Sequence, residues 1–218
     1  VRDSERLKEI LDGIDIVVHT AAMKRVEMAE PNIVESIKVN VLGTLNLLQE
    51  CRKAKVEKFL LISSDKAVPV DDEISNYGAT KLLQERITLC SKSPPKCAVA
   101  RFGNVIGTRG DVFEIWRRQA SEGKPLTITH PEMKRFFWAM EKAVDFIINC
   151  LAATQGGEIF VPEMGEFNLV EEAKKFFGET IQFMQIGLRP GEVLKHKLMT
   201  EEEMRTAKRE SWGWVIRQ

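Results

Sequence analysis

Apolar runs rich in β-branched residues alternate along the chain with amphipathic stretches. Six runs have the length and composition of strands, and they lie at residues 14–22, 58–64, 97–102, 126–130, 158–163 and 181–187. Six stretches with helical spacing of apolar residues accompany them, at residues 4–11, 33–54, 77–91, 112–122, 141–153 and 169–177. Continuous apolar runs are typical of parallel strands buried on both faces. The pattern therefore predicts a doubly wound α/β fold of the Rossmann type.

We expect this fold to consist of two parts. Residues 1–102 and 136–155 would form a dinucleotide-binding sheet domain, and residues 103–135 and 156–218 a smaller lobe that closes over a ligand. Nowhere do the 218 residues contain G-x-G-x-x-G or G-x-x-G-x-x-G ahead of a helix. That glycine turn normally opens such a sheet, because it lets backbone N–H groups approach the cofactor pyrophosphate. We therefore expect a Rossmann sheet that lacks its first βα units.

Composition narrows the classes of partner. Lys and Arg together number 32, and so do Asp and Glu, so no bulk positive charge favours nucleic acid. The four cysteines form no C-x-x-C pair, which argues against a zinc site and a disulfide framework and fits a reducing cytoplasm. No apolar run approaches the roughly 18 residues of a membrane span, so we expect no membrane insertion.

A tyrosine and a lysine stand one helical turn apart in the segment YGATK. Tyr77 and Lys81 are four residues apart, which puts them on one face of a helix. A cation at that distance favours the phenolate and lowers the phenol pKa from about 10, so Tyr77 can take a proton from an alcohol. An isolated pair of this spacing is more often an exposed helix surface. Here, however, Tyr77 is the only tyrosine of the chain, and a strand ending in SSDK precedes it.

The acid and the amine of that SSDK segment suggest a particular reaction. Asp65 and Lys66 follow the apolar run KFLLISS, and ligands of open α/β sheets bind at the carboxyl ends of the strands. A dehydration next to a carbonyl needs one group to remove a carbon-bound proton and another to protonate the departing hydroxyl. Asp65, Lys66 and Tyr77 together would supply these groups. Taken alone, the tripeptide SDK is more often a solvated turn.

Seven segments in order resemble the signatures of the inverting UDP-N-acetylglucosamine 4,6-dehydratases. These polysaccharide-biosynthesis enzymes belong to the extended short-chain dehydrogenase/reductase group. The segments extend over nearly the whole chain and read HTAAMKRVEMAEPNIVESIKVNVLGT, ISSDKAV, YGATK, RFGNVIGTRG, MKRFFWAMEKAV, GGEIFVPEM and IGLRPGEVLKHKLMTEEE.

The resemblance implies a bound NADP and a UDP-sugar substrate. The cofactor would oxidise C4 of UDP-N-acetylglucosamine, water would be lost across C5 and C6, hydride would return to C6, and C5 would be reprotonated on the opposite face. The product would be a UDP-linked 4-keto-6-deoxy sugar of L-arabino configuration. By this resemblance Lys66 is the base at C5, Asp65 the acid for the C6 hydroxyl, and Tyr77 the acid/base at C4.

The resemblance also assigns supporting residues. Lys81 would hold the nicotinamide ribose, Ser64 would keep a hydroxyl used by the family, and Asn40 would support the active-site lysine through water. Ala21 and Ala22 would line the cofactor. Four residues are expected near the nucleotide-sugar, namely Asn104, Arg135, Arg189 and Glu192; their alternatives are a loop-capping Asn and surface ion pairs. Two carboxylates would lie close to the sugar diphosphate and repel it, namely Asp111 and Glu114.

Two other functions stay open at this point. A simple nucleotide-sugar 4-epimerase would share the fold, but epimerisation at C4 needs no base at C5, which argues against it. A non-catalytic descendant that acts as a binding or assembly subunit would explain the lack of a glycine turn. We expect the 218-residue chain by itself to be inactive, and we expect it to form a homo-oligomer or to pair with a segment that supplies the missing βα units.

Overall fold

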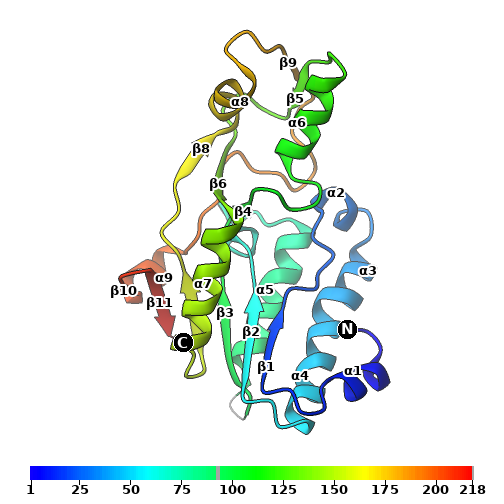
Figure 1. Ribbon diagram of the computed structural model, residues 1–218, viewed down its shortest axis with the longest axis vertical. Coiled ribbons are helices and arrows are strands. Elements are labelled where there is room, and N and C mark those ends of the chain that lie inside the picture. Colours follow the sequence, from blue (N-terminus) through cyan, green and yellow to red (C-terminus); the bar gives the residue numbers. More distant parts are fainter. Residues whose placement is uncertain (92–93, 218) are drawn as a thin grey trace.

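A six-stranded sheet forms the larger part of the molecule in the computed structural model, which describes residues 1–91 and 94–217. The first four strands of its spatial order are parallel, and the last two are antiparallel to their neighbours. In spatial order the strands are β1 (Ile16–His19), β2 (Lys58–Ile62), β3 (Lys96–Ala100), β7 (Glu158–Val161), β11 (Gly213–Arg217) and β10 (Lys208–Glu210). The predicted α/β Rossmann-type fold is confirmed (Figure 1).

Helices cover both faces of this sheet. Successive residues of a strand point to opposite faces, so each strand contributes side chains to two apolar cores. Phe59 and Leu61 of β2 belong to one apolar core, and Leu60 between them belongs to the other. The first core includes side chains of α1 (Ser4–Ile10), α4 (Gly43–Lys53) and α5 (Asn76–Leu89), and the second those of α7 (Met140–Ala153). Strands covered in this way need apolar residues at every position, which is the pattern that predicted them.

The helical segment predicted at residues 33–54 is continuous but changes its winding. It consists of α3 (Ile33–Ser36), a π-helical stretch η1 (Ile37–Leu42) and α4. The short helix α2 (Val26–Ala29), which was not predicted, lies between β1 and α3. π-helical turns occur preferentially at functional sites, and this one carries the predicted cofactor residue Asn40.

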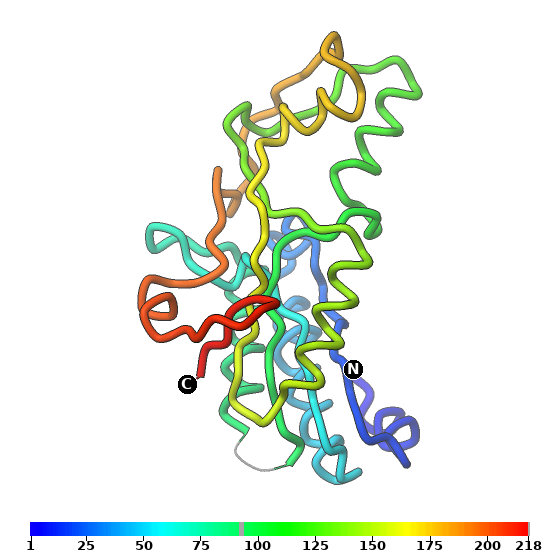
Figure 2. Tube along the Cα trace, turned by 60° about the vertical axis from the view of Figure 1, so that its left-hand side comes forward, coloured from blue at the N-terminus to red at the C-terminus, as the bar shows by residue number. Residues whose placement is uncertain are grey.

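A smaller lobe extends beyond one end of the sheet (Figures 1 and 2). Its core contains Phe113, Trp116 and Phe137, which pack edge to face. One small sheet consists of β4 (Asn104–Val105), β6 (Lys134–Trp138) and β8 (Glu166–Asn168), a second of β5 (Leu126–Ile128) and β9 (Phe183–Gln185). The lobe's helices are α6 (Val112–Ser121) and α8 (Leu169–Phe177).

The predicted limits of the lobe need one correction. We assigned all of residues 156–218 to it, but β7 pairs in parallel with β3, and β11 pairs with β7 in the main sheet. Every residue of β7 is buried, as expected of a strand covered on both faces. After crossing the lobe, the chain returns through α9 (Glu201–Thr206) to β10 and β11, which lie beside β7 (Figure 2).

Strand β1 forms an edge of the described sheet. Ile16 and Val18 point to the same face of the sheet as α7. This helix covers the neighbouring strands but not β1, so Ile16 and Val18 remain 48% and 38% exposed. Val144 and Ile148, one turn apart on α7, are also exposed. An open strand edge beside exposed apolar side chains is a surface on which another strand and helix can pack.

Candidate active site

The loops after three parallel strands meet at one edge of the sheet. Residues 20–25 follow β1, residues 63–66 follow β2, and residues 101–104 follow β3. Because the strands are parallel, their carboxyl ends lie together, which is where open α/β sheets bind ligands. The lobe stands directly beyond this edge (Figure 1).

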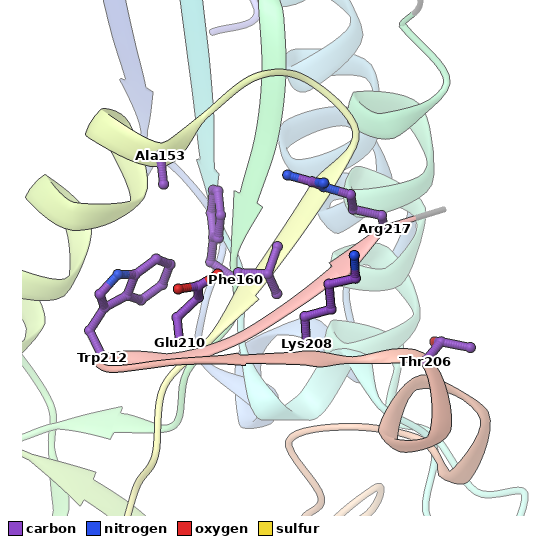
Figure 3. Close-up of a pocket in the computed structure, with 8 residues that line it drawn as sticks. Ala153, Phe160, Thr206, Lys208, Glu210, Trp212 and Arg217 are labelled. Atoms are coloured by element: carbon purple, nitrogen blue, oxygen red, sulfur yellow. The ribbon is translucent and has the colours of Figure 1, made fainter.

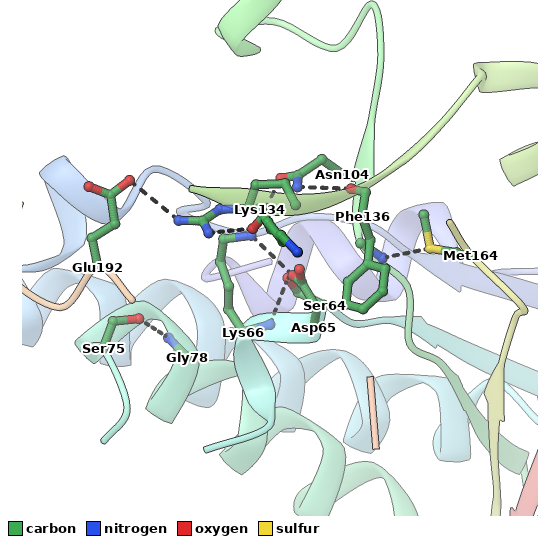
Figure 4. Close-up of polar contacts among 12 residues, drawn as sticks. Ser64, Asp65, Lys66, Ser75, Gly78, Asn104, Lys134, Phe136, Met164 and Glu192 are labelled. Atoms are coloured by element: carbon green, nitrogen blue, oxygen red, sulfur yellow. Dashed lines mark hydrogen bonds and ion pairs between the residues drawn. The ribbon is translucent and has the colours of Figure 1, made fainter. Parts of the chain in front are cut away.

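Ser64, Asp65 and Lys66 form a compact polar cluster at the end of β2 (Figure 4). Ser64 caps the short 3₁₀ turn η2 (Asp65–Ala67). Asp65 Oδ1 accepts hydrogen bonds from Ser64 Oγ at 2.9 Å and from Lys66 Nζ at 3.0 Å. Lys66 Nζ also lies 3.4 Å from the amide oxygen of Asn104, which follows β3. The structure thus brings together an acid, an amine and a hydroxyl predicted from sequence.

The charge of Asp65 is held inside the protein. The side chain is fully buried, which by itself raises the pKa of its carboxyl, but the charge of Lys66 acts against burial. Hydrogen bonds from Lys66 and Ser64 act in the same direction, so the pKa of Asp65 lies below its ordinary value. Asp65 is therefore a carboxylate paired with Lys66 in this state. Its second oxygen, Oδ2, is buried without a hydrogen-bond partner.

A glycine lets Tyr77 approach this cluster. Ser75 caps α5 by accepting a hydrogen bond from Gly78 N (Figure 4). A Cβ atom at Gly78 would lie 2.1 Å from the carbonyl oxygen of Lys66, a distance that no side chain tolerates. The first turn of α5 can therefore pack directly on the Asp65–Lys66 turn only because residue 78 is glycine. The buried Tyr77 hydroxyl forms a hydrogen bond with Ser64.

The electrostatics of Tyr77 and Lys81 correct one expectation. We expected Lys81 to lower the pKa of the phenol, but burial raises the pKa of Tyr77 well above its ordinary value, and the charge of Asp65 adds to this, against the Ser64 hydrogen bond. Lys81 Nζ instead donates to the carbonyl of Ile62 at 2.7 Å. Burial lowers the pKa of Lys81 to about 8. A phenolate at Tyr77 is thus not favoured by this state of the protein.

Asn40 ties the loop after β1 to α5. Its Oδ1 accepts from Met23 N at 2.7 Å, and its Nδ2 donates to Thr80 Oγ1 at 2.9 Å. Asn40 is fully buried, and Thr80 directly precedes Lys81. Ala21 and Ala22 directly precede Met23 in this loop, and Ala21 is exposed and Ala22 half-buried. The water-mediated link to the lysine stays a prediction.

Three of the four predicted nucleotide-sugar residues lie in or beside the cluster. Asn104 Nδ2 donates to the carbonyl of Phe136, so its amide oxygen is directed at Lys66. Arg135 Nη2 lies 3.4 Å from Glu192 Oε1, and both side chains are largely buried, so this is not a surface pair. Arg189 is the outlying member, with an exposed side chain 4.0 Å from Glu27.

The two carboxylates of the loop before α6 have a structural role. Asp111 caps α6 by accepting from Glu114 N at 2.6 Å, and it also accepts from Gly107 N. Glu114 accepts from Gly110 N. Backbone donors at a helix N-terminus therefore compensate these charges. The expected repulsion of a diphosphate by these carboxylates stays a prediction.

A buried charge network near the site was not predicted. Arg101 binds Glu85 of α5 with two hydrogen bonds, of 3.0 and 2.6 Å, and Glu203 of α9 with two of 2.8 and 2.9 Å. Glu203 also completes a capping box with Thr200. The sequence T-E-E-E indicates such a capping box. It does not indicate the ion pair with Arg101, which lies 102 residues before Glu203 in the chain. The network fixes the segment that returns from the lobe to the sheet.

His196 is the second residue that sequence reasoning missed. It is 9% exposed, and its Nδ1 is buried without a hydrogen-bond partner. Burial lowers the pKa of His196 to about 3, and the charges of Asp65, Lys66 and Arg135 act on it. As one of only three histidines in the chain, inside a segment of the resemblance, it could have been singled out.

A separate cavity of about 400 Å³ lies between β10, β11 and the end of α7 (Figure 3). Its lining residues are Ala153, Phe160, Thr206, Lys208, Glu210, Trp212, Val215 and Arg217. None of the predicted site residues is among them. We place the candidate site at Asp65 rather than in this cavity, because the buried acid and phenol, Asp65 and Tyr77, have perturbed pKa values and lie beside Lys66.

The six-stranded sheet and the polar cluster at the carboxyl ends of its strands define a Rossmann-type α/β protein. The chain belongs to the family described as "Polysaccharide biosynthesis protein", which matches residues 1–216.

Several curated relatives are similar over most of the chain. An "Uncharacterized membrane protein MJ1061" of Methanocaldococcus jannaschii is 39% identical, over 94% of this chain and 65% of the relative. A UDP-N-acetylglucosamine 4,6-dehydratase (inverting) of Campylobacter jejuni is 35% identical, over 93% and 61%. A UDP-glucose 4-epimerase of Rickettsia akari is 34% identical, over 95% and 62%. The chain thus spans less than two thirds of the length of these relatives.

Solved structures agree on the architecture. Pen from Bacillus thuringiensis has a TM-score of 0.91 at 34% identity, over 100% of this chain and 70% of that one. DesIV, a dTDP-glucose 4,6-dehydratase from Streptomyces venezuelae described with NAD bound, has a TM-score of 0.81 at 20% identity, over 94% and 70%, a likeness of fold alone. In the described part of the chain, no helix has the length and apolar character to cross a bilayer.

Proposed function

We propose that this chain carries the sugar-transforming site of an NADP-dependent UDP-N-acetylglucosamine 4,6-dehydratase that inverts C5, for the synthesis of surface polysaccharide. The observation that carries the proposal is the buried Asp65–Lys66 pair beside Tyr77, at 3.0 Å between Nζ and Oδ1. The relative from Campylobacter with that printed name supports the choice of substrate.

The cofactor fits one end of the site. Lys81 Nζ uses one of its three hydrogens on the Ile62 carbonyl, which leaves donors for the two hydroxyls of a ribose. Tyr77 and Ser64 would lie against the nicotinamide, and Ala21 and Ala22 would flank it. The glycine turn for the pyrophosphate is not among these 218 residues, so its binding would need a further segment. When bound, NADP supplies the hydride acceptor for C4 and the donor for C6.

The ion pair explains how one site removes and delivers a proton. Dehydration takes up and releases the same number of protons. One proton is removed from C5, and one is added to the C6 hydroxyl, which leaves as water. If the Lys66 proton shifts to Asp65, the pair becomes a neutral amine and a carboxylic acid. The amine then takes the C5 proton, the acid protonates the C6 oxygen as the C6–O bond breaks, and the ion pair is restored.

The resting charge state sets a condition on this step. For a lysine and an aspartate in water the neutral pair costs about 9 kcal/mol, from pKa values that differ by roughly 6.5 units. Excluding water raises the free energy of both charges and therefore reduces that difference. Asp65 is already fully buried, and the Lys66 side chain keeps 17% exposure. A bound sugar would cover that remaining face, so proton transfer within the pair becomes accessible only in the complex.

A UDP-glucose 4-epimerase is the second candidate, because relatives with that printed name are 34% identical. Oxidation and reduction at C4 need Tyr77 and the cofactor but no proton transfer at C5. The Asp65–Lys66 pair would then have no chemical role. A non-catalytic binding subunit remains the alternative if no reaction occurs in a folded, cofactor-loaded protein.

Replacing Lys66 by Met in the complete, NADP-loaded enzyme tests the proposal. We expect loss of water release and of C5 proton exchange with solvent, since the C5 base is gone, while the fold persists. Deuterium incorporation at C5 in heavy water, followed by NMR, measures this directly. Lys142→Met, at an exposed lysine on α7, is the matched control and should exchange like the parent protein. Unchanged exchange in Lys66→Met would exclude the assignment, and C4 inversion without any exchange at C5 would favour the epimerase.

A further inference from the structure

A turn in the segment that returns from the lobe to the sheet rests on the start of helix α5. This turn comprises residues 189–192, and Glu192 closes it, because its N donates to Arg189 O at 3.0 Å and its Oε2 accepts from Arg189 N at 3.2 Å. Glu192 Oε1 lies 3.4 Å from Arg135 Nη2 of β6, which joins the turn to the lobe. Figure 4 shows Glu192 on the side of the cluster where Ser75 caps α5.

Gly191 is the point at which this turn meets α5. A Cβ atom added to it would lie 2.8 Å from Ser75 Cβ and 2.9 Å from Glu30 Oε1. Both distances are shorter than an ordinary contact, so no side chain fits between the turn and the helix. The backbone φ of Gly191 is +72°, which also favours glycine. The turn approaches α5 this closely only because residue 191 has no side chain.

The surface beneath Gly191 is fixed by its own hydrogen bonds. Glu30 Oε1 accepts from the backbone N of Asn76, the first residue of α5, at 2.7 Å, and Glu30 O accepts from Asn76 Nδ2 at 3.2 Å. A carboxylate at a helix N-terminus is favourable. Ser75 is buried, and Tyr77 directly follows Asn76 in the chain. The turn therefore packs on a rigid surface one residue away from the phenol.

We propose that Gly191 is a positioning residue for Tyr77, because its packing on Ser75 sets the distance between the lobe and the first turn of α5. This inference rests on the proposed dehydratase function, in which Arg135 and Glu192 hold the UDP-sugar and Tyr77 meets its C4 hydroxyl. A sugar held at the lobe reacts only when its C4 is delivered to the phenol. Gly191 itself touches no reacting atom and acts through the position of the turn.

A matched pair of glycines isolates this contact. In Gly191→Ala the new Cβ needs roughly 3.5 Å to Ser75 Cβ, so the turn and α5 must separate by about 0.7 Å. Gly187 lies in the same segment with a φ of +81°, and nothing lies within 4 Å of its Cβ position. Gly187→Ala therefore carries the same backbone strain without the contact. A difference between the two variants measures the packing on α5.

The nuclear Overhauser effect between the Gly191 α protons and the Ser75 β protons provides a first test, which needs neither cofactor nor turnover. We expect it in the 218-residue parent chain and in Gly187→Ala. In Gly191→Ala the corresponding effect between residues 191 and 75 should weaken, because the two segments separate. Absence of the effect in the parent chain would overturn the proposal, whatever reaction the enzyme catalyses.

Kinetics of the complete, NADP-loaded enzyme provide the second test. A misplacement of about 1 Å can slow a reaction by 10²-fold, so we expect Gly191→Ala to slow NADP reduction by UDP-N-acetylglucosamine by about 10- to 100-fold. Gly187→Ala should react at close to the parental rate. The affinity for NADP should be equal in all variants, a separation that general destabilisation would not produce.

A second substitution can relieve the contact and so restore the rate. Ser75→Gly removes the nearest carbon atom, and glycine is tolerated at an N-cap. Combined with Gly191→Ala it should recover most of the lost rate, because the remaining contact is the end of the flexible Glu30 side chain. A parental rate in Gly191→Ala, or no recovery in the double variant, would contradict the positioning role. If the parent enzyme does not oxidise the sugar, the proposed function fails, and the Overhauser effect by itself decides whether the turn packs on α5.

Discussion

Gly78 is the residue on which assembly of the candidate site depends, and Gly78→Ala is therefore the most direct structural perturbation. The added Cβ would lie 2.1 Å from Lys66 O and 2.9 Å from Ile74 Cγ1. An ordinary contact of this kind needs about 3.3 Å, so α5 and the Asp65–Lys66 turn must separate by roughly 1.2 Å. The obstacle is backbone, so no change of side-chain rotamer can relieve it.

The expected magnitude follows from two opposing effects. Alanine in place of a helical glycine stabilises by about 1 kcal/mol, whereas overpacking costs about 1–3 kcal/mol and sometimes more. We expect Gly78→Ala to lower the free energy of unfolding by about 1–2 kcal/mol. Gly43→Ala is the matched control in helix α4, because its Cβ would meet Val1 Cγ2 at 2.7 Å and Val1 Cβ at 3.3 Å, in a terminal residue that can move, while the nearest backbone atom, Lys38 O, lies at an ordinary contact distance of 3.6 Å. That variant should be neutral or more stable.

Urea unfolding followed by circular dichroism and tryptophan fluorescence measures both variants against the parent chain. The unfolding free energies of Gly78→Ala and Gly43→Ala should differ in sign relative to the parent. If Gly78→Ala is as stable as Gly43→Ala, the close packing of α5 on Lys66 is wrong, and with it the geometry that brings Tyr77 to Asp65.

Three further predictions test the chemistry and the electrostatics. Tyr77→Phe in the cofactor-loaded enzyme should slow C4 oxidation by about 10² to 10⁴-fold with little change in cofactor affinity; NADP reduction at the parental rate would contradict its role. Folded His19 has a pKa of about 4 against about 6.5 unfolded, so the unfolded chain binds more protons between these values, and the free energy of unfolding should fall by roughly 3 kcal/mol as pH drops from 6.5 to 4. His19→Gln should remove this part of the dependence and leave the part that comes from His196, whose pKa burial also lowers, as urea unfolding across that pH range will show. The 218-residue chain by itself should bind NADP weakly or not at all, because it has no glycine turn for the pyrophosphate. Calorimetry measures this, and micromolar binding would refute it. Added protein that supplies a glycine-rich βαβ unit should restore binding.

The parts of the fold that sequence predicted are those with a local signature. The runs at 58–64 and 97–102 became β2 and β3, since strands covered on both faces need apolar residues throughout. Helix α8 was also predicted correctly, because its N-cap is a local signal: Asn168 Oδ1 accepts from Val170 N and Glu171 N nearby. The second contact of this side chain, from Nδ2 to Pro131 O at 2.9 Å, reaches a distant segment that no local pattern indicates. In contrast, β11 gains its place from pairing with β7, and β10 from pairing with β11, which no local pattern encodes.

The same distinction holds for the candidate site. Asp65, Lys66 and Tyr77 could be predicted to meet because each follows a parallel strand or begins the next helix, so topology brings them together. The rise in the pKa of Tyr77 could not be predicted from the sequence, because it depends on how completely the folded chain excludes water from the phenol. His196 was missed for a related reason, because its burial depends on the path of the chain back from the lobe.

The returning segment connects these observations. Its outer part, with Arg189, is exposed, whereas its inner part is fixed to the sheet by Arg101, whose charge is matched by two buried or half-buried glutamates. Removing one partner of such a buried pair is far more costly than losing a surface pair. His196 lies within the inner part, between Leu194 and Leu198, whose carbonyls accept hydrogen bonds from Arg135 and Arg101.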